Sequence, residues 1–214
     1  MVDAFAAAEA KLFVAYYRCA LPVFVEAKRL LESGAIGTLT SVNYQFSTPA
    51  HRRENGWRVD PEIAGGGLFL DLGSHAINAL QWIVGPFDRV RGNAARAHPQ
   101  SRVEEVVTLQ WDNGDALGTG YWNFAGDHSE DTIELVGTDG RLAWSCFGKG
   151  DLTLACGSSA ETMNHPNPHH VHQPLIQSIV DDLSGKGTCP SDAFSGMRTS
   201  EIMDVALAGF RSKK

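Results

Sequence analysis

The chain has 214 residues, of which 43% are hydrophobic and 20% are charged, a composition that is typical of a folded globular protein and excludes a disordered one. Its 18 basic and 25 acidic side chains give a formal net charge of −7, which argues against nucleic acid as a partner. The sequence shows no secretory signal and no apolar run near the ~18 residues that span a bilayer, and its four scattered cysteines indicate a reduced, cytoplasmic protein without membrane contact.

The first 20 residues predict part of an α/β layer. Residues 3–10 are alanine-rich and indicate a helix, and residues 11–17 (KLFVAYY) form a short apolar run that predicts a buried strand. A helix followed directly by a buried strand is half of a β-α-β unit. The chain is therefore expected to begin inside an α/β layer whose earlier elements are absent.

A helix, a strand and a loop are predicted next. Pro22 stands where a helix can begin, and the apolar pattern continues to residue 31, before the helix-ending Gly34. Over residues 38–48, apolar and polar side chains alternate, which predicts a half-buried strand. Residues 49–64 are polar and rich in turn formers, so we expect a surface loop.

The most informative stretch, residues 64–78 (AGGGLFLDLGSHAIN), joins three glycines to a helix predicted over about residues 66–84. At 100° per residue, a narrow polar stripe lies beside a broad apolar sector. The sector should pack on a sheet, so we expect the stripe at the edge of a cleft. The stripe contains Asp71, His75, Asn78 and Trp82, and the sector contains Leu68, Phe69, Leu72, Ala76, Leu80 and Ile83.

The second half of the chain predicts a sheet built from hairpins. Strands are expected at about residues 87–97, 102–111, 115–125, 130–136, 140–147 and 151–156. The turn sequences at residues 112–115 and 137–140 favour hairpins, and therefore an antiparallel arrangement. Residues 157–170 are interpreted as a loop.

Two helices are predicted to close the chain, at about residues 171–184 and 192–211, the second with Ser191 or Asp192 as its N-cap. The predicted fold class is α+β: an open, mostly antiparallel β-sheet with helices on one face. Hairpin-connected strands followed by helices are typical of this class.

Asp71 and His75 are the leading candidates for chemistry because residues four apart share a helix face. A carboxylate beside an imidazole can act as an acid/base pair, in which His75 transfers a proton and Asp71 orients it or raises its basicity. The alternative is a surface pair that only supports the helix. The three glycines favour catalysis, since glycine near a helix start costs stability unless something needs the space.

Other residues offer weaker signals. Trp57 and Arg58 precede the glycines and are candidates to contact a polar substrate, although Trp57 could instead anchor the loop to the core. The glycines form no phosphate loop, since position 70 is Leu and no Gly-Lys-Ser/Thr occurs, so residues that bind a cofactor are unknown.

A histidine-rich segment at residues 165–172 (HPNPHHVH) is the one candidate for a metal site. It lacks a nearby Cys or a His-Glu-x-x-His spacing, so no metal is predicted. We expect His172 or a neighbour to cap a helix or to line the cleft. The four cysteines are expected to be small core residues.

The segment GWRVDPEIAGGGLFLDLGSHAIN resembles the central motif of the Gfo/Idh/MocA oxidoreductases (glucose–fructose oxidoreductase and inositol dehydrogenase). The segments VAYYRCALPVFVEAKRLLESGAIGTLTSV and PLIQSIVDDLSGKGTCPSDAFSGMRTSEIMDVALAGF resemble its flanking parts, in the same order. The resemblance implies a Rossmann domain that binds NAD or NADP and a C-terminal sheet that binds substrate and mediates oligomers. It also implies active-site positions for Asp71 and His75, and it sets Asn78 where many members have Asp.

Two family motifs, Gly-x-Gly-x-x-Gly and the Glu-Lys-Pro that carries a catalytic lysine, do not occur in the chain. The resemblance therefore implies that residues 1–20 are a remnant of the Rossmann domain and residues 21–214 the substrate-binding and oligomerisation domain. The expected function is the C-terminal part of an NAD(P)-dependent oxidoreductase that moves a hydride to or from a sugar, polyol or related metabolite. Trp57, Arg58 and Asn78 are its expected substrate contacts, and the chain alone is expected to be inactive.

Two alternatives remain open at this stage. One is a catalytically silent homo-oligomerisation or ligand-binding module, in which a second copy covers the exposed face of the open sheet. The other is a metal hydrolase that uses the histidines between His165 and His172. The sequence does not identify the substrate, nor whether NAD or NADP is used.

Overall fold

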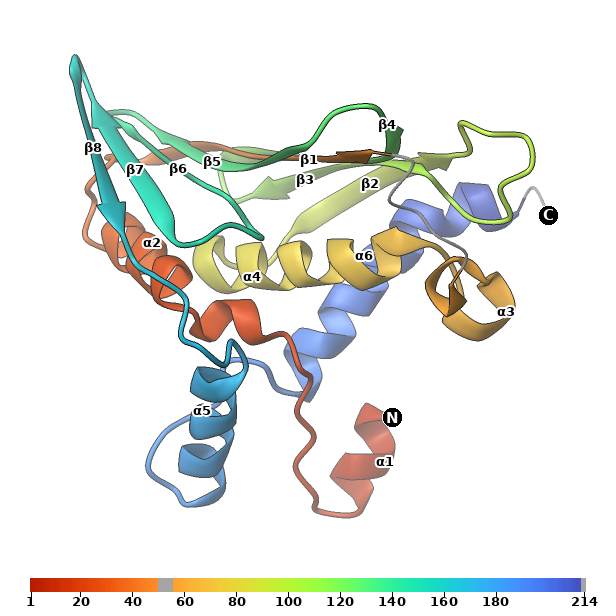
Figure 1. Ribbon diagram of the computed structural model, residues 1–214. Coiled ribbons are helices and arrows are strands. Elements are labelled where there is room, and N and C mark those ends of the chain that lie inside the picture. Colours follow the sequence, from red (N-terminus) through yellow and green to blue (C-terminus); the bar gives the residue numbers. More distant parts are fainter. Residues whose placement is uncertain (50–55, 213–214) are drawn as a thin grey trace.

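The computed structural model describes residues 1–49 and 56–212, and in them one open sheet carries its helices on a single face (Figure 1). The strands are β1 (Leu39–Pro49), β2 (Asp88–Ala95), β3 (Val106–Asn113), β4 (Ala116–Gly126), β5 (Glu130–Gly137), β6 (Arg141–Trp144), β7 (Asp151–Cys156) and β8 (Ser159–Asn164). The main helices are α1 (Val2–Ala7), α2 (Pro22–Glu32), α4 (Ser74–Val84), α5 (Gln173–Leu183) and α6 (Ala193–Arg211). Short helical turns are η1 (Tyr17–Ala20), η3 (Trp57–Val59), α3 (Pro61–Ala64) and η4 (Phe69–Gly73).

The strand order is β2-β3-β4-β1-β5-β6-β7-β8, and β1 with β4 is the parallel pair among antiparallel neighbours. This confirms the predicted mostly antiparallel sheet and both predicted hairpin turns. The prediction of a loop over residues 157–170 is wrong in its first half, where β8 pairs with β7. The strand carries mostly exposed polar side chains, so it lacks the apolar alternation by which strands are recognised.

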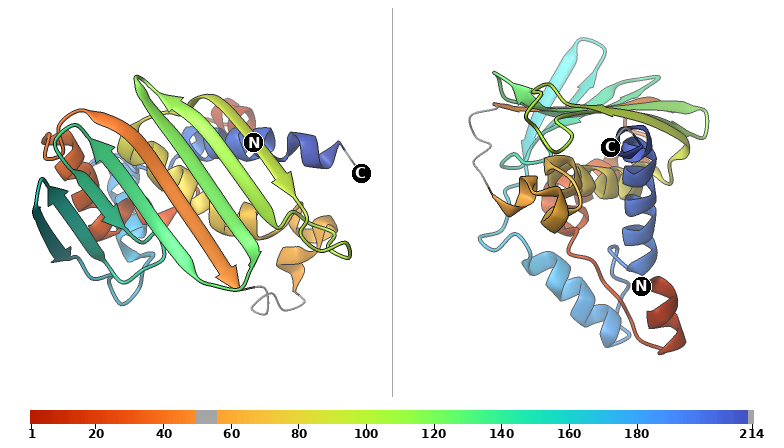
Figure 2. Two further views of the ribbon diagram at one scale, coloured as in Figure 1. Left: turned by 90° about the horizontal axis from the view of Figure 1, so that it is seen from above. Right: turned by 90° about the vertical axis from the view of Figure 1, so that its right-hand side faces the viewer.

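The core lies between the inner face of the sheet and helices α2, α4 and α6, as the end-on view shows (Figure 2). Large rings fill this layer, among them Trp111 from β3 and Trp122 from β4, both almost fully buried. Gly118 of β4 leaves space for the Trp111 ring, whose atoms lie 1.9–2.4 Å from where a Cβ would stand. The outer face is polar, with exposed Thr108, Gln110 and Thr119.

The predicted strand over residues 11–17 is wrong. This segment is extended but forms a single bridge, between Phe13 and Asp192, and the amide of Val14 donates to the carbonyl of Ser191 at 3.0 Å. The described part of the chain offers it no strand along its length, so its apolar side chains are only half-buried. It ends in the turn η1, which leads directly into α2.

The helix predicted over residues 66–84 is divided in two. Residues 69–73 form the π-helical turn η4, and α4 continues from Ser74 to the predicted stop at Gly85. A π turn holds more residues than an α turn, so 100° per residue does not describe it. As a result Phe69 is fully buried, whereas Leu68 and Leu72 are only half-buried.

The remaining helices agree with the sequence. Helices α2, α5 and α6 lie where they are expected, and Asp192, not Ser191, caps α6 by accepting the amide of Ser195 at 2.8 Å. Of the predicted loop at 49–64, residues 50–55 lie outside the described residues, and the rest folds into η3 and α3. Within the described residues, no helix is long and apolar enough to cross a membrane.

Candidate active site

His75 lies in the first turn of α4, directly after the π turn, and aromatic rings pack against it. The rings of Tyr16 and Tyr17 meet it edge-on, with centroids at 5.5 Å and 5.3 Å. The extended segment before η1 brings these tyrosines to α4. The Nδ1 atom of His75 is buried and has no hydrogen-bond partner among the described residues.

The surroundings of His75 favour its neutral form. The pKa of His75 is lowered to about 4, chiefly by burial and also by the positive charge of Arg18, against the opposing effect of Asp71. Arg18 itself is only 6% exposed. At neutral pH the imidazole is therefore uncharged and has a lone pair that can accept a proton, although its lowered pKa makes it a weaker base than an ordinary histidine.

Asp71, in the π turn, directs its carboxylate to Arg58, whose Nε donates to Oδ2 at 2.8 Å. The carboxylate therefore acts on His75 through its charge, which raises the pKa of the imidazole. Of the two roles that the sequence predicted for Asp71, the geometry supports the electrostatic one. The backbone carbonyl of Asp71 accepts from Ser74 Oγ at 2.7 Å, which ties the π turn to α4.

Trp57 and Arg58 lie on the solvent side of Asp71. The guanidinium of Arg58 covers the indole of Trp57 at 4.4 Å from the ring centre. Trp57 is 55% exposed, so the alternative in which it anchors its loop to the core does not hold. Both side chains are free to meet a ligand that approaches Asp71 from solvent.

Three residues near His75 were not singled out from the sequence: Tyr16, Tyr17 and Arg18. The Nη2 of Arg18 donates to the Tyr17 hydroxyl at 3.1 Å, and its guanidinium lies 3.9 Å from the centre of the Phe147 ring. Arg18 also donates to the carbonyl of Cys146. The sequence Tyr-Tyr-Arg at 16–18 could have indicated these residues, but both tyrosines were assigned to a buried strand.

His172 joins the same cleft. Its ring lies 4.2 Å from the ring of Tyr17, which in turn touches His75. It occupies the N-cap position of α5 without a capping hydrogen bond from its side chain. The expected cap of a helix by its side chain is therefore not formed.

The three glycines serve close packing. The amide of Gly67 donates to Glu104 Oε1 at 2.8 Å, and a Cβ on Gly67 would stand 2.8 Å from the Glu104 carbonyl oxygen. Gly65 takes a positive φ of 77° as the C-cap of α3. Residues 103–104 thus occupy the space that Gly67 leaves.

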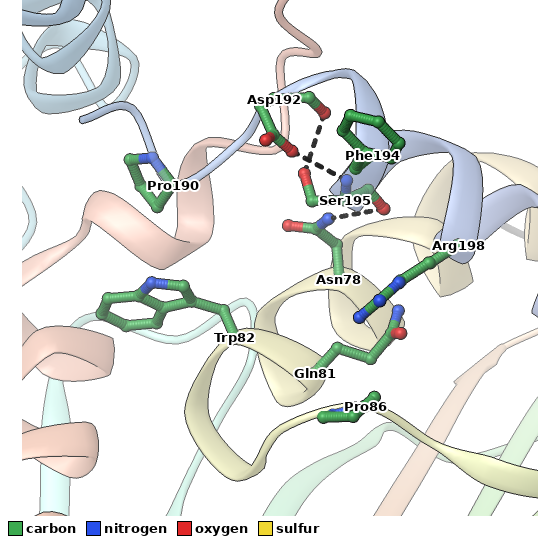
Figure 3. Close-up of a pocket in the computed structure, with 9 residues that line it drawn as sticks. All are labelled: Asn78, Gln81, Trp82, Pro86, Pro190, Asp192, Phe194, Ser195 and Arg198. Atoms are coloured by element: carbon green, nitrogen blue, oxygen red, sulfur yellow. Dashed lines mark hydrogen bonds between the residues drawn. The ribbon is translucent and has the colours of Figure 1, made fainter. Parts of the chain in front are cut away.

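Asn78 is 2% exposed and directed to α6, where its Nδ2 donates to the Ser195 carbonyl at 3.5 Å (Figure 3) and to Thr199 Oγ1 at 3.2 Å. It lines a separate cavity between α4 and α6. The structure thus brings Asp71, His75, Trp57 and Arg58 into one region but turns Asn78 to another. Among the described residues, no group of three or more His, Cys, Asp or Glu side chains could hold a metal ion. All four cysteines are free thiols.

Comparison with known proteins gives concordant matches. The GFO/IDH/MocA C-terminal domain matches residues 24–143, which is more than half of the chain. An oxidoreductase of Formosa agariphila, Oxidoreductase P35, is 28% identical over 210 residues, which cover 96% of this chain and 65% of that protein. Levoglucosan dehydrogenase of Pseudarthrobacter phenanthrenivorans is 30% identical over 167 residues, which cover 64% of this chain and 43% of that enzyme.

The fold has solved counterparts. A levoglucosan dehydrogenase in complex with NADH and levoglucosan superposes with a TM-score of 0.81 at 20% identity, covering 96% of this chain and 65% of the other. This match shows the shared open-sheet fold. The chain spans about two thirds of the length of Oxidoreductase P35, at 65%, and less than half of the levoglucosan dehydrogenase matched by sequence, at 43%.

Proposed function

The chain belongs to the GFO/IDH/MocA family through its C-terminal domain, and on that premise we propose that it is the substrate-binding part of an NAD(P)-dependent oxidoreductase. The substrate class is a sugar, a polyol or a related hydroxy or keto metabolite. The name of the levoglucosan dehydrogenase relative supports a sugar-like substrate. The observation that carries the proposal is the half-buried, neutral imidazole of His75, whose buried Nδ1 has no partner among the described residues.

In this proposal His75 is the acid/base residue. Removing a hydride from a carbinol carbon requires the loss of the hydroxyl proton, and a neutral imidazole within hydrogen-bond reach accepts it. In the reverse direction the imidazolium returns the proton to the carbonyl oxygen. Asp71 and Arg18 act on this step in opposite ways, since the carboxylate raises and the guanidinium lowers the pKa of His75.

The walls of the cleft position the substrate. The edges of Tyr16 and Tyr17 meet the His75 ring, so the imidazole is held by packing. His172 extends the polar lining beyond Tyr17. Trp57 and Arg58 are the proposed contacts on the solvent side, where an aromatic ring and a guanidinium suit a polyhydroxyl compound.

The described residues do not fit the pyrophosphate of a dinucleotide. The only run of three glycines in the chain packs on Glu104, whose carboxylate already takes the amide of Gly67 and would repel a phosphate. When bound, the nicotinamide supplies or accepts the hydride, and its binding residues are assigned to a Rossmann domain outside this chain. NAD and NADP are equally compatible with this assignment.

The proposal therefore divides the reaction between two domains, and this division of labour is as follows. Residues 1–20 are taken as the remnant of the Rossmann domain, and residues 21–214 as the substrate and oligomerisation domain. The isolated chain is expected to show no dehydrogenase activity. A cytoplasmic location is part of the proposal, and the four free thiols support it.

A homo-oligomer formed through the sheet is the second candidate role. The outer face of the sheet has no helix packed on it in the described structure (Figure 2). A second copy of this polar face, with Asn43, Gln110 and Thr119, could pair with it through hydrogen bonds. Light scattering should then report a dimer or larger species at micromolar concentration, and a clean monomer would count against this role.

The proposed function can be tested by NMR with labelled histidines. A panel of hexoses and polyols, including levoglucosan, should contain members that shift the ring resonances of His75 and His172 but leave the exposed His128 unchanged. The variant His75→Asn should weaken this binding. The absence of any His75 shift across the panel would contradict the proposal, and hydride transfer by the isolated chain with NAD(P) would contradict the division of labour.

A further inference from the structure

A second cavity, of about 320 Å³, lies between α4 and the N-terminal turn of α6 (Figure 3). Its lining includes Asn78, Gln81 and Trp82 from α4, and Asp192, Phe194 and Arg198 from α6 and its cap. None of these side chains belongs to the walls of the His75 cleft. The volume is at the small end of the range for ligand sites and suits a compound of a few carbon atoms.

A buried polar atom beside this cavity, Asn78 Oδ1, is an acceptor without a donor among the described residues. Asn78 is only 2% exposed, and its Oδ1 has no hydrogen-bond partner among the described residues. The amide nitrogen is already engaged, with Thr199 Oγ1 at 3.2 Å and the Ser195 carbonyl at 3.5 Å. Figure 3 shows the oxygen turned away from Ser195, toward the space between Pro190 and Trp82. Buried polar atoms almost always have partners, so this oxygen points to a missing donor.

The same cavity is lined by Arg198, a cation without a partner among the described residues. Arg198 is exposed and makes no ion pair or side-chain hydrogen bond within the described residues. Its guanidinium points from α6 toward Gln81 (Figure 3). The nearby carboxylate of Asp192 is occupied, because it caps α6 through the Ser195 amide at 2.8 Å. Charge-assisted pairing with a planar carboxylate is the interaction that a free guanidinium favours.

Apolar surface completes the lining. The ring of Phe194 is 60% exposed, an unusual state for a phenylalanine that nothing covers. The Trp82 ring also lines the cavity, and the ammonium of Lys28 lies 5.1 Å from its centre. Rings of this kind pack on the carbon skeleton of a small ligand.

We propose that this cavity between α4 and α6 binds a small hydroxylated carboxylate, distinct from the substrate of the His75 cleft. Its carboxylate pairs with Arg198, a hydroxyl donates to Asn78 Oδ1, and its carbon atoms lie against Trp82 and Phe194. The assignment uses both unsatisfied groups of the cavity, one acceptor and one cation. A neutral polyol satisfies only the first of them and should bind more weakly.

Titration calorimetry of the 214-residue chain tests this with L-tartrate as the probe and erythritol as its neutral four-carbon counterpart. L-Tartrate should bind, erythritol should bind at least about tenfold more weakly, and Arg198→Gln should weaken L-tartrate by about tenfold. Arg211→Gln is the matched control, since Arg211 lies on the same helix but pairs with Asp204 at 2.6 Å. Its affinity for L-tartrate should equal that of the unchanged chain.

The position of the ligand needs a second readout. In nitrogen-15 spectra the indole signal of Trp82, assigned by its loss in Trp82→Phe, should move on addition of L-tartrate, and His75→Asn should leave the affinity unchanged. The inference is overturned if L-tartrate does not bind, if Arg198→Gln binds it as tightly as Arg211→Gln, or if His75→Asn abolishes binding. The last result would place the probe in the His75 cleft and would leave the proposed function intact.

Discussion

The segment from Gly65 to His75 has two sides with different roles, one in packing and one in chemistry. Its inward side, with Gly67 and Phe69, is fixed by packing, since Phe69 is fully buried against Trp122 with ring centroids 5.0 Å apart. Its outward side, with Asp71 and His75, carries charge and a buried imidazole with a free nitrogen. One motif thus contains a structural half and a chemical half, and only the second half has the properties of a site.

The difference shows why a motif that identifies a family does not by itself describe a site. The glycines suggested open space, but the space beside Gly67 is filled by Glu104, which also accepts the Gly67 amide. The π turn, in contrast, links the two halves, because it buries Phe69 while leaving Asp71 beside Arg58. Substitutions on the inward side should therefore change stability, and those on the outward side should change the response to pH.

The largest effect is expected on the inward side. Phe69→Ala removes a fully buried ring that packs on Trp122, and it should lower the free energy of unfolding by about 3–5 kcal/mol. Trp57→Ala, on the outward side, should change it by less than about 1 kcal/mol because that ring is mostly exposed. Urea unfolding followed by circular dichroism measures both, and equal losses would remove the distinction between the two sides.

The next effect is a dependence of stability on pH. The pKa of His75 is about 4 in the folded chain against an ordinary value of 6.5, so the unfolded chain binds this proton first as the pH falls. Stability from His75 is therefore complete above pH 6.5 and is lost between pH 6.5 and 4, by about 3 kcal/mol. His75→Asn should lack this loss in unfolding experiments at pH 7 and pH 4, and an identical loss in both proteins would contradict the burial of a neutral imidazole.

A smaller effect is expected at the glycines. Gly67→Ala places a Cβ 2.8 Å from the Glu104 carbonyl oxygen, and the resulting shift should cost about 1–3 kcal/mol of unfolding free energy. Gly209→Ala is the control, because nothing lies within 4 Å of its Cβ position in α6, and alanine in a helix should stabilise by about 1 kcal/mol. If Gly67→Ala were also stabilising, the glycines would not be packed as described.

The smallest effect on stability is expected for the ion pair. Asp71 and Arg58 are partly exposed, with side-chain exposures of 38% and 50%, so Asp71→Asn should cost less than about 1 kcal/mol. It should nevertheless lower the pKa of His75, because the Asp71 charge raises it. Thermal unfolding and histidine NMR measure the two effects, and a raised His75 pKa in Asp71→Asn would reverse the electrostatic role given to Asp71.

Much of the fold follows from the sequence because its signals are local. The alternation in β1, the turn at residues 112–115, the proline at the start of α2 and the cap of α6 each predict their element from a few neighbouring residues. The strand β8 and the extended segment at 11–17 were wrongly assigned, since their states depend on the neighbour that each does or does not find. A local sequence pattern carries no information about which distant segments pair.

The candidate site was only half predictable for the same reason. Asp71 and His75 are read from one motif, but Arg18, Tyr17 and His172 reach the cleft from elements far apart in the chain. The π turn was also hidden, because an apolar pattern over residues 66–84 does not distinguish a π turn from an α turn. Asn78, which was predicted to share a stripe with Asp71 and His75, instead faces α6.

The central claim is that this chain supplies a neutral, buried base at His75, and its pKa is the most direct test. NMR titration of the His75 ring in the unchanged chain should give a pKa of about 4, well below the ordinary histidine value of 6.5. An imidazole that stays neutral down to that pH agrees with the proposed acid/base role. A His75 pKa of 6.5 or above would contradict it, because the ring would then be solvated or paired, not held as a buried base.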